Sequence, residues 1–189
     1  MARRPGLSRE TVVRAAADLV NAEGLEALSI TRLADKLGVQ PPSLYNHVSG
    51  LEDLRRELAL AGHRRLAACM AEAAIGRSGE EALAAAAGAY RAFIKGAPGV
   101  YAAGLRASGN REQADEELRE AEEQVLKIVM AILRSFDLEG EEAIHAARGL
   151  RSLVHGFTTL EVSGGFGLPL DLDESFRRLL RMLVLGMQR

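Results

Sequence analysis

A run of eight residues, 40–47, carries side chains suited to hydrogen bonding with a partner outside the protein. Its sequence is QPPSLYNH. Gln40 and Asn46 are amides, which donate and accept hydrogen bonds at once; Asn46 can meet a base edge, and Gln40 can read adenine. Tyr45 and His47 can donate to phosphate oxygens, and the tyrosine ring can pack on a sugar. These residue types together suit the recognition of a nucleic acid.

Three predicted helices must position this run. The first begins after the N-cap Ser8, and the second begins after the N-cap Ser29 and ends before Gly38. The third begins at Pro41-Pro42, because the first N–H groups of a helix have no intrahelical partner and proline is tolerated there. The double proline therefore fixes where the third helix starts and the direction in which it leaves the turn.

The second helix, the tight turn at Gly38-Val39 and the third helix form a helix-turn-helix pattern. In that motif the second of the two helices lies in the major groove of DNA, and its N-terminal residues meet base edges. The third helix is too short to be stable by propensity, so Leu44 and Val48 are predicted to anchor it to the other two. An ordinary helical hairpin with a polar surface has the same spacing, and spacing alone leaves both interpretations open.

Residues 24–48, GLEALSITRLADKLGVQPPSLYNHV, resemble the N-terminal DNA-binding domain of the tetracycline-repressor (TetR/AcrR) transcription regulators. The shared pattern includes the Leu-Ala…Leu-Gly-Val helix and turn and the Leu-Tyr-x-His end, and it covers residues 8–54. The resemblance implies backbone contacts near the start of the second helix, base contacts from the third helix, and phosphate contacts at its end. The residues implied for the backbone contacts are Thr31 and Arg32. Those implied for the base contacts are Gln40, Pro41, Ser43 and Leu44, and those for the phosphate contacts are Tyr45 and His47.

One position departs from the family pattern. The family often has a lysine that contacts phosphate at the start of the fourth helix, and this chain has Leu51 there. Either that phosphate contact is missing or Arg55 supplies it. A missing contact would reduce the slope of DNA affinity against salt by roughly one unit per half-site.

The rest of the chain is also predicted to be helical. Alanine and leucine, both strong helix formers, dominate the composition, and no sustained alternation of apolar and polar residues is present. We therefore predict an all-α protein of about nine helices. Its N-terminal domain would cover residues 1–50 and its C-terminal domain residues 51–189, with a helix from about 51 to 75 linking the two. The later helices are predicted at 80–96, 98–107, 111–136, 141–163 and 172–187.

The last two predicted helices carry broad apolar faces that suit an interface between two subunits. Two such helices from each subunit would build a four-helix bundle, and a two-fold dimer suits a pseudo-palindromic DNA site. The alternative is that these faces close the core of a single chain. The predicted interface residues are Leu153, Leu160, Phe176, Leu179, Leu180, Leu183 and Met187.

The resemblance implies that the C-terminal part binds a small effector as well as a second subunit. Residues 151–167 resemble a subgroup named for a Trp-His-Gly signature, with Val154 in place of the tryptophan and His155-Gly156 retained. A largely hydrophobic effector is expected, although each candidate also suits an ordinary core or surface position. The candidate lining residues are Tyr90, Phe93, Tyr101, Leu105, Met130, Leu133 and Phe157, with Arg106, His155 or Glu161 as polar selectors.

Other classes of function lack a signature in the sequence. The four histidines have no metal-binding spacing, the lone Cys69 completes no zinc set, and no nucleotide-binding or hydrolase motif is present. We expect no enzyme activity, no cofactor, no metal and no membrane span. The single cysteine and the absence of a signal peptide predict a cytoplasmic protein.

Charge is distributed in favour of DNA binding by the N-terminal third. The net charge of the chain is −2, but residues 1–66 hold 10 Lys and Arg against 8 Asp and Glu. This asymmetry permits DNA binding without demonstrating it.

The family resemblance implies a repressor released from its operator when an effector tilts the fourth helix. That tilt would change the spacing of the two recognition helices in the dimer, which must match one turn of DNA, about 34–36 Å. The alternative is a non-enzymatic helical module that binds a ligand or a partner protein, with a silent helix-turn-helix.

Overall fold

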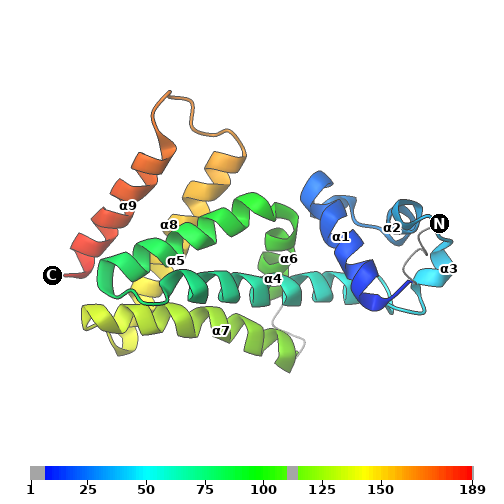
Figure 1. Ribbon diagram of the computed structural model, residues 1–189, viewed down its shortest axis with the longest axis horizontal. Coiled ribbons are helices and arrows are strands. Elements are labelled where there is room, and N and C mark those ends of the chain that lie inside the picture. The colour runs from blue at the N-terminus through cyan, green and yellow to red at the C-terminus, as the bar shows by residue number, and fades with distance from the viewer. Residues whose placement is uncertain (1–6, 110–114, 189) are drawn as a thin grey trace. The chain divides into compact units, whose positions relative to one another are not determined.

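Helices account for all the regular structure that the computed structural model describes, over residues 7–109 and 115–188 (Figure 1). The predicted all-α class is confirmed, with no strand in these ranges. None of the helices in the described ranges is long and apolar enough to cross a membrane. The α-helices are α1 (Arg9–Glu23), α2 (Ile30–Leu37), α3 (Pro41–Leu44), α4 (Leu51–Ala74), α5 (Gly79–Gly96), α6 (Pro98–Gly109), α7 (Glu116–Leu133), α8 (Gly140–Val162) and α9 (Leu172–Met187). Short 3-10 turns, η1 (Leu25–Ala27) and η2 (Arg134–Phe136), follow α1 and α7.

The contacts of the chain divide it into two units. Unit 1 contains the described residues of Met1–His63 and Ala97–Leu118, and unit 2 those of Arg64–Gly96 and Arg119–Arg189. Unit 1 therefore takes residues from both sides of the boundary drawn at residue 50 by the sequence. Helices α4 and α7 each begin in unit 1 and continue into unit 2.

The predicted helix caps of unit 1 are confirmed. The hydroxyl of Ser8 accepts a hydrogen bond from the N–H of Thr11, and that of Ser29 accepts one from the N–H of Arg32, each at 3.2 Å. Gly38 ends α2 in the left-handed conformation, with φ of 66°, which favours glycine. These caps fix the two ends of the turn that precedes α3.

Helix α6 packs closely against α1 in unit 1. The N–H groups of Gly99 and Val100, in the first turn of α6, both donate to Oδ1 of Asn21 at 3.1 Å. A Cβ atom on Gly99 would overlap the backbone of Val20, so only glycine permits this approach. Asn21 thus satisfies N–H groups that have no partner within α6 and holds α6 to the end of α1.

Three helices of unit 2, α5, α8 and α9, meet around Arg91, which is 8% exposed. Its guanidinium makes a two-pronged ion pair with Glu161, at 2.7 and 2.8 Å, and donates to Asp173 at 2.7 Å. It also lies over the rings of Phe176 and Phe157, at 4.9 and 5.4 Å from their centroids. One arginine from α5 therefore joins α8 and α9 by charge and by cation–π contact.

Other sequence-based boundaries shift modestly. The helix predicted to start at Arg111 begins at Glu116, and residues 110–114 lie outside the described residues. The predicted helix to Phe136 is an α-helix only to Leu133 and is followed by the 3-10 turn η2. Asp137, directly after η2, adopts a left-handed conformation.

We predict that Glu161→Gln lowers the free energy of unfolding by about 3 kcal/mol, because it leaves the charge of Arg91 buried without its main partner. Chemical denaturation at a fixed protein concentration measures this change. Glu174→Gln is the matched control, since Glu174 pairs with Arg177 and Arg178 at the surface and should matter far less. Equal effects of the two substitutions would contradict a central role for the Arg91 cluster.

The ion pair between Arg91 and Glu161 also predicts how the loss of stability in Glu161→Gln depends on pH. Hydrogen bonding from Arg91 lowers the pKa of Glu161 below its ordinary value of 4.5; burial opposes this shift, and Lys95 adds to it. The stabilisation is therefore present above about pH 4.5 and is lost as the pH falls through the lowered pKa. The stability gap between the native protein and Glu161→Gln should close in acid.

Candidate nucleic-acid interface

The candidate interface is built on the short helix α3 and the turn after it. Gln40 has extended backbone angles and precedes the two prolines, and its carbonyl accepts from the N–H of Ser43 at 2.9 Å. After α3 the chain continues in a turn, in which the N–H groups of His47 and Val48 both donate to the carbonyl of Leu44. Residues 40–47 therefore form one continuous, hydrogen-bonded segment, which we call the recognition segment.

Two apolar side chains fix the recognition segment to the core of unit 1. Leu44 is fully buried and Val48 is 2% exposed, so the predicted anchoring of α3 is confirmed. Four residues are too few for an isolated helix to be stable. Burial of a leucine and a valine stabilises the segment by about 1.5–3 kcal/mol each, a free energy that the helix propensity of four residues does not provide.

The base contact assigned to Leu44 by the family resemblance is wrong for this structure. A side chain without exposed surface cannot meet a base unless the anchor of α3 is undone. The sequence predicts an anchoring role for Leu44 and the resemblance implies a base-reading role, but helix geometry allows only the first, because one side chain cannot face the core and the solvent together.

The other predicted DNA contacts all retain exposed surface. Tyr45 is 57% exposed, and Gln40 and Asn46 are exposed as well, whereas Pro41, Ser43 and His47 are half-buried. Thr31 and Arg32 are exposed in the first turn of α2. Their individual roles in DNA binding stay predictions.

Arg32 has an acidic neighbour that the sequence did not reveal. Its guanidinium forms an ion pair with Glu23 at the end of α1, and the two side chains are 50% and 42% exposed. An ion pair this exposed contributes little to stability. Glu23 would, however, compete with a phosphate for the same guanidinium.

Arg55 is poorly placed to replace the lysine that the family often has at the position of Leu51. Its side chain is 18% exposed, and it donates to Glu52 at 2.5 Å. Partial burial and a nearby carboxylate both reduce its availability to a phosphate. The structure therefore favours the other alternative, in which this phosphate contact is missing.

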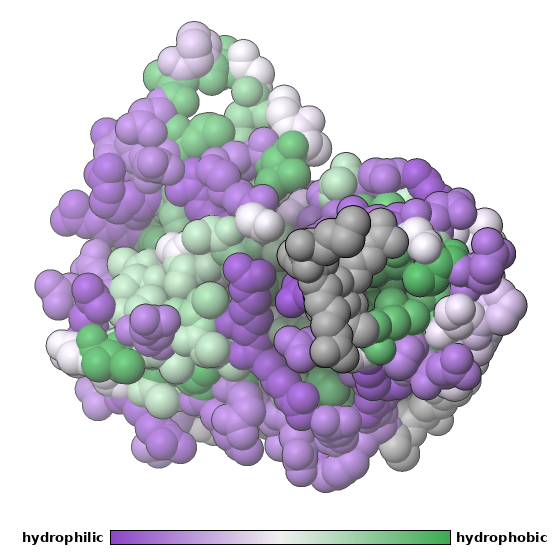
Figure 2. Space-filling view, turned by 45° about the vertical axis from the view of Figure 1, so that its right-hand side comes forward, coloured by the Kyte–Doolittle hydropathy of each residue, from purple (hydrophilic) through white to green (hydrophobic). Residues whose placement is uncertain are grey.

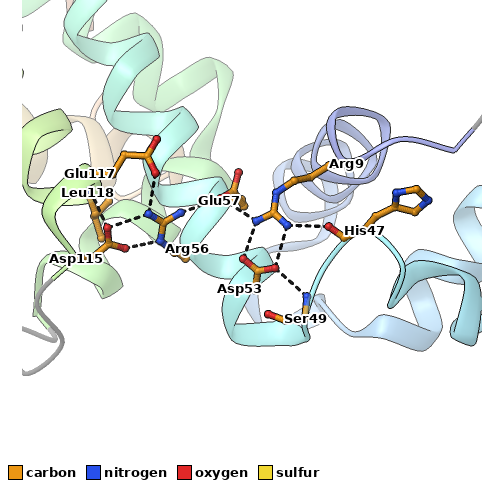
Figure 3. Close-up of polar contacts among 9 residues, drawn as sticks. All are labelled: Arg9, His47, Ser49, Asp53, Arg56, Glu57, Asp115, Glu117 and Leu118. Atoms are coloured by element: carbon orange, nitrogen blue, oxygen red, sulfur yellow. Dashed lines mark hydrogen bonds and ion pairs between the residues drawn. The ribbon is translucent and has the colours of Figure 1, made fainter.

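Arg9 joins α1 to the end of the recognition segment, a role that was not predicted from the sequence (Figure 3). Its guanidinium donates to the carbonyl of His47 at 2.7 Å and to both carboxylate oxygens of Asp53, at 2.7 and 3.2 Å. Asp53 also accepts the N–H of Ser49 at 2.8 Å. The imidazole of His47 points away from Arg9 and leaves the backbone carbonyl to make this contact.

The carboxyl of Asp53 is held in its charged form by these partners. Burial raises its pKa, but hydrogen bonds from Arg9 and from the N–H of Ser49 outweigh burial, so the pKa lies below the ordinary value. No local motif in the sequence links Arg9 to Asp53, because 44 residues separate them. Only the tertiary structure of unit 1 brings the two together.

The candidate effector-binding residues fall in both units. Tyr101, Leu105 and Arg106 belong to unit 1, and Arg106 pairs with Glu26 at 2.9 Å. The others belong to unit 2, where Phe157 packs against Arg91 and against the rings of Phe166 and Phe176. Glu161, a proposed polar selector, is the main partner of Arg91. The remaining candidates of unit 2 are Tyr90, Phe93, Met130, Leu133 and His155.

Some predicted subunit-interface residues of α9 are core residues of a single chain. Phe176 and Leu180 are each 5% exposed, so the prediction is wrong for these two, because their surface is already covered within the protomer. Leu153, Leu179, Leu183 and Met187 are half-buried. Leu160 remains 49% exposed, and the structure adds Met182 and Leu185, at 66% and 54% exposed, which the prediction omitted.

More apolar surface lies on the connection between α8 and α9. Leu168 and Leu170 are 75% and 70% exposed. Figure 2 shows green, hydrophobic surface at the top of the view, where this connection lies. The end of unit 2 that carries α8 and α9 is therefore partly apolar.

Comparison with known proteins gives matches to both parts of the chain. Residues 12–58 match the family described as bacterial regulatory proteins, tetR family, and residues 83–183 match the tetracyclin repressor-like, C-terminal domain. The HTH-type transcriptional regulator YobS of Bacillus subtilis (strain 168) is 37% identical over 188 residues, which cover 99% of this chain and 96% of YobS.

Solved structures show the same fold. A protein of unknown function from Rhodococcus sp. RHA1 matches over 100% of both chains, with 22% identity and a TM-score of 0.83. A TetR variant from Acinetobacter baumannii AYE in complex with minocycline matches over 97% of both chains, with 22% identity and a TM-score of 0.70. At these identities the likeness supports the fold, and the family rests on the sequence matches.

The anchored recognition segment follows a capped second helix and a left-handed glycine turn, as in a helix-turn-helix. The sequence matches extend this likeness from the N-terminal domain to nearly the whole chain. The chain belongs to the TetR family and is a DNA-binding transcriptional regulator.

Proposed function

We propose that this regulator is a repressor, which binds a pseudo-palindromic operator as a homodimer and leaves it when a small hydrophobic effector binds. The observation that carries this proposal is the recognition segment itself. Leu44 and Val48 hold it from beneath, while Gln40, Tyr45 and Asn46 stay exposed. Repression is proposed because the family usually represses.

The exposed side chains divide by the part of the DNA that each suits. Gln40 and Asn46 have the amide groups that can donate and accept at a base edge. Tyr45 and His47 suit phosphate oxygens, as do Thr31 and Arg32 in the first turn of α2. In this proposal the amides contribute specificity and the other side chains fix the position of the segment on the duplex.

Effector response would pass through α4. This helix begins at Leu51, just after the recognition segment, and continues for 24 residues to Ala74. A tilt of α4 would change the separation of two recognition segments that must match one turn of DNA, about 34–36 Å. A coupling free energy of roughly 1–3 kcal/mol between effector and operator would weaken operator binding about 5- to 150-fold.

A small-molecule effector has two lines of support. Ligand response is typical of the family, and the TetR variant from Acinetobacter baumannii was solved in complex with minocycline. The candidate lining residues of unit 2 are mainly apolar and aromatic, which favours a largely hydrophobic effector.

Homodimer formation would use the exposed apolar residues of α8 and α9. Leu160, Met182 and Leu185 are each about half exposed or more, and contact with a second copy would cover them. A two-fold dimer presents two copies of the recognition segment to the two half-sites of a pseudo-palindrome.

We predict that the purified protein prefers the DNA upstream of its own gene to a shuffled duplex by about three orders of magnitude or more at physiological salt. Fluorescence anisotropy over a salt series measures both affinities. Specific binding should weaken steeply with salt, because Arg and Lys contacts release counterions from the phosphates. Equal and weak binding to both duplexes would favour the alternative function, a ligand- or partner-binding module with a silent helix-turn-helix, and would be followed by a genome-wide search for bound DNA.

We predict that Gln40→Ala weakens operator binding about 5- to 150-fold, because a bidentate contact to adenine contributes roughly 1–3 kcal/mol of discrimination. Binding to the shuffled duplex should change little, since it depends on phosphate contacts. Gln124→Ala, which removes an exposed amide from α7, is the matched control and should leave both affinities unchanged. An equal loss on the two duplexes would assign Gln40 to backbone contact instead of base reading.

We predict that Glu23→Gln strengthens DNA binding by about two- to fivefold at low salt, because it removes the carboxylate that competes for Arg32. The gain should shrink at high salt, where the ion pair is already screened. The control is Glu26→Gln, whose carboxylate pairs with Arg106. Unchanged or weaker binding by Glu23→Gln would show that Arg32 does not need to leave Glu23 when DNA binds.

A further inference from the structure

The contacts of Arg9 continue beyond Asp53 into a longer chain of ion pairs within unit 1 (Figure 3). Glu57, one helical turn after Asp53 on α4, accepts Arg9 at 3.0 Å on its oxygen Oε1. The same oxygen accepts Arg56 at 2.9 Å. One carboxylate oxygen thus receives two guanidinium groups, and it links the contacts of Arg9 to those of Arg56.

Arg56 extends the chain of ion pairs to the start of α7. Its guanidinium contacts both oxygens of Asp115, one of them at 2.9 Å, and an oxygen of Glu117 at 2.9 Å. Asp115 directly precedes α7 and accepts the N–H of Leu118 at 3.1 Å. Asp115 therefore caps α7 and binds Arg56 with the same side chain. The position of the first turn of α7 and that of the Arg56 guanidinium thus constrain each other.

Three carboxylates of this chain of ion pairs are largely buried, whereas Arg9, Arg56 and Glu117 are 46%, 32% and 47% exposed. The side chains of Asp53, Glu57 and Asp115 are 16%, 20% and 22% exposed. The guanidinium of Arg56 lowers the pKa of Asp115, against the effect of burial and with help from the N–H of Leu118, so this carboxyl is ionised at neutral pH. Partial burial reduces screening by solvent and makes the geometry of the contacts more restrictive.

Arg9 and Arg56 each bind more than one carboxylate of this chain of ion pairs. Among the described residues, two guanidinium groups join four carboxylates, those of Asp53, Glu57, Asp115 and Glu117. Removing either arginine would remove the contacts that join these carboxylates to one another. The chain of ion pairs should therefore respond as a unit, and the effects of removing its members should not add.

We propose that this chain of ion pairs, from the carbonyl of His47 through Arg9, Glu57 and Arg56 to Asp115, transmits the position of the first turn of α7 to the recognition segment. Arg9, Arg56 and Asp115 are then positioning residues for operator binding. The inference rests on the proposed function and adds the link through which a displacement of α7 would change operator affinity.

The physical reason lies in the weakness of the recognition segment itself. Its helix has four residues, so its last turn depends on external contacts, and the carbonyl of His47 is held by Arg9. Loss of the contact at Asp115 would free Arg56, redistribute both guanidinium groups around Glu57, and loosen the hold of Arg9 on the segment. Groups that read base edges must keep their orientation, so specific binding should suffer more than binding through phosphates.

The test is a double-mutant cycle with Arg9→Gln and Asp115→Asn in the full-length protein. Operator affinity, affinity for a shuffled duplex and thermal unfolding are measured for the wild type, both single variants and the double variant. We expect Asp115→Asn to weaken operator binding about 5- to 20-fold, with a much smaller change on the shuffled duplex. The double variant should bind no worse than Arg9→Gln alone, because each substitution interrupts the same chain.

Asp171→Asn is the matched control. Asp171 caps α9 in unit 2 by accepting the N–H of Asp173 at 2.8 Å, so the substitution alters an equivalent cap outside this chain of ion pairs. It should leave operator affinity unchanged. Arg9→Lys adds a conservative variant, which keeps the charge and loses the fork that contacts His47 and Asp53 together; it should fold and still weaken operator binding.

The outcomes separate the two proposals. The wild type could prefer its operator while Asp115→Asn binds that operator unchanged, or while the losses of the two single variants add in the double variant. Either result would overturn the proposed transmission from α7 to the recognition segment and leave the proposed function intact. A lower melting temperature in Asp115→Asn with unchanged operator affinity would assign Asp115 a structural role only. A wild type without any operator preference would overturn the proposed function and this inference with it.

Discussion

The burial of Leu44 and Val48 is the interaction on which the DNA-binding surface depends. A helix of four residues has no stability of its own, and these two side chains fix its axis against the core of unit 1. The polar residues around them can then face outward in a defined order. Without this anchor, Gln40, Tyr45 and Asn46 would sit on a flexible loop and would lose the orientation that base reading requires.

Arginines with several partners connect helices that are distant in sequence in both units. Arg9 joins α1 to the end of the recognition segment and to α4, and Arg91 joins α5 to α8 and α9. A guanidinium suits this role because its planar fork presents five donors to several acceptors at once. Hydrophobic burial brings the helices together in each unit, and these charged contacts restrict their orientation.

The sequence predicted the local features of the candidate site well. Ser8 and Ser29 cap their helices, Gly38 makes the left-handed turn, and the third helix begins at the prolines. Each of these features depends on neighbouring residues alone. The family resemblance assigned Leu44 to base contact, but this chain buries the Leu44 side chain.

The sequence by itself determined the all-α class, the helix-turn-helix and the exposed polar residues, since caps, turns and apolar periodicity act over a few residues. Only the tertiary structure decided which charges meet, because Arg9 and Asp53, or Arg56 and Asp115, come from segments that are distant in sequence. It also decided that Phe176 and Leu180 close the core of the protomer while Met182 and Leu185 stay exposed. Periodicity gives an apolar face to a helix, and packing alone determines which part of that face the chain itself covers.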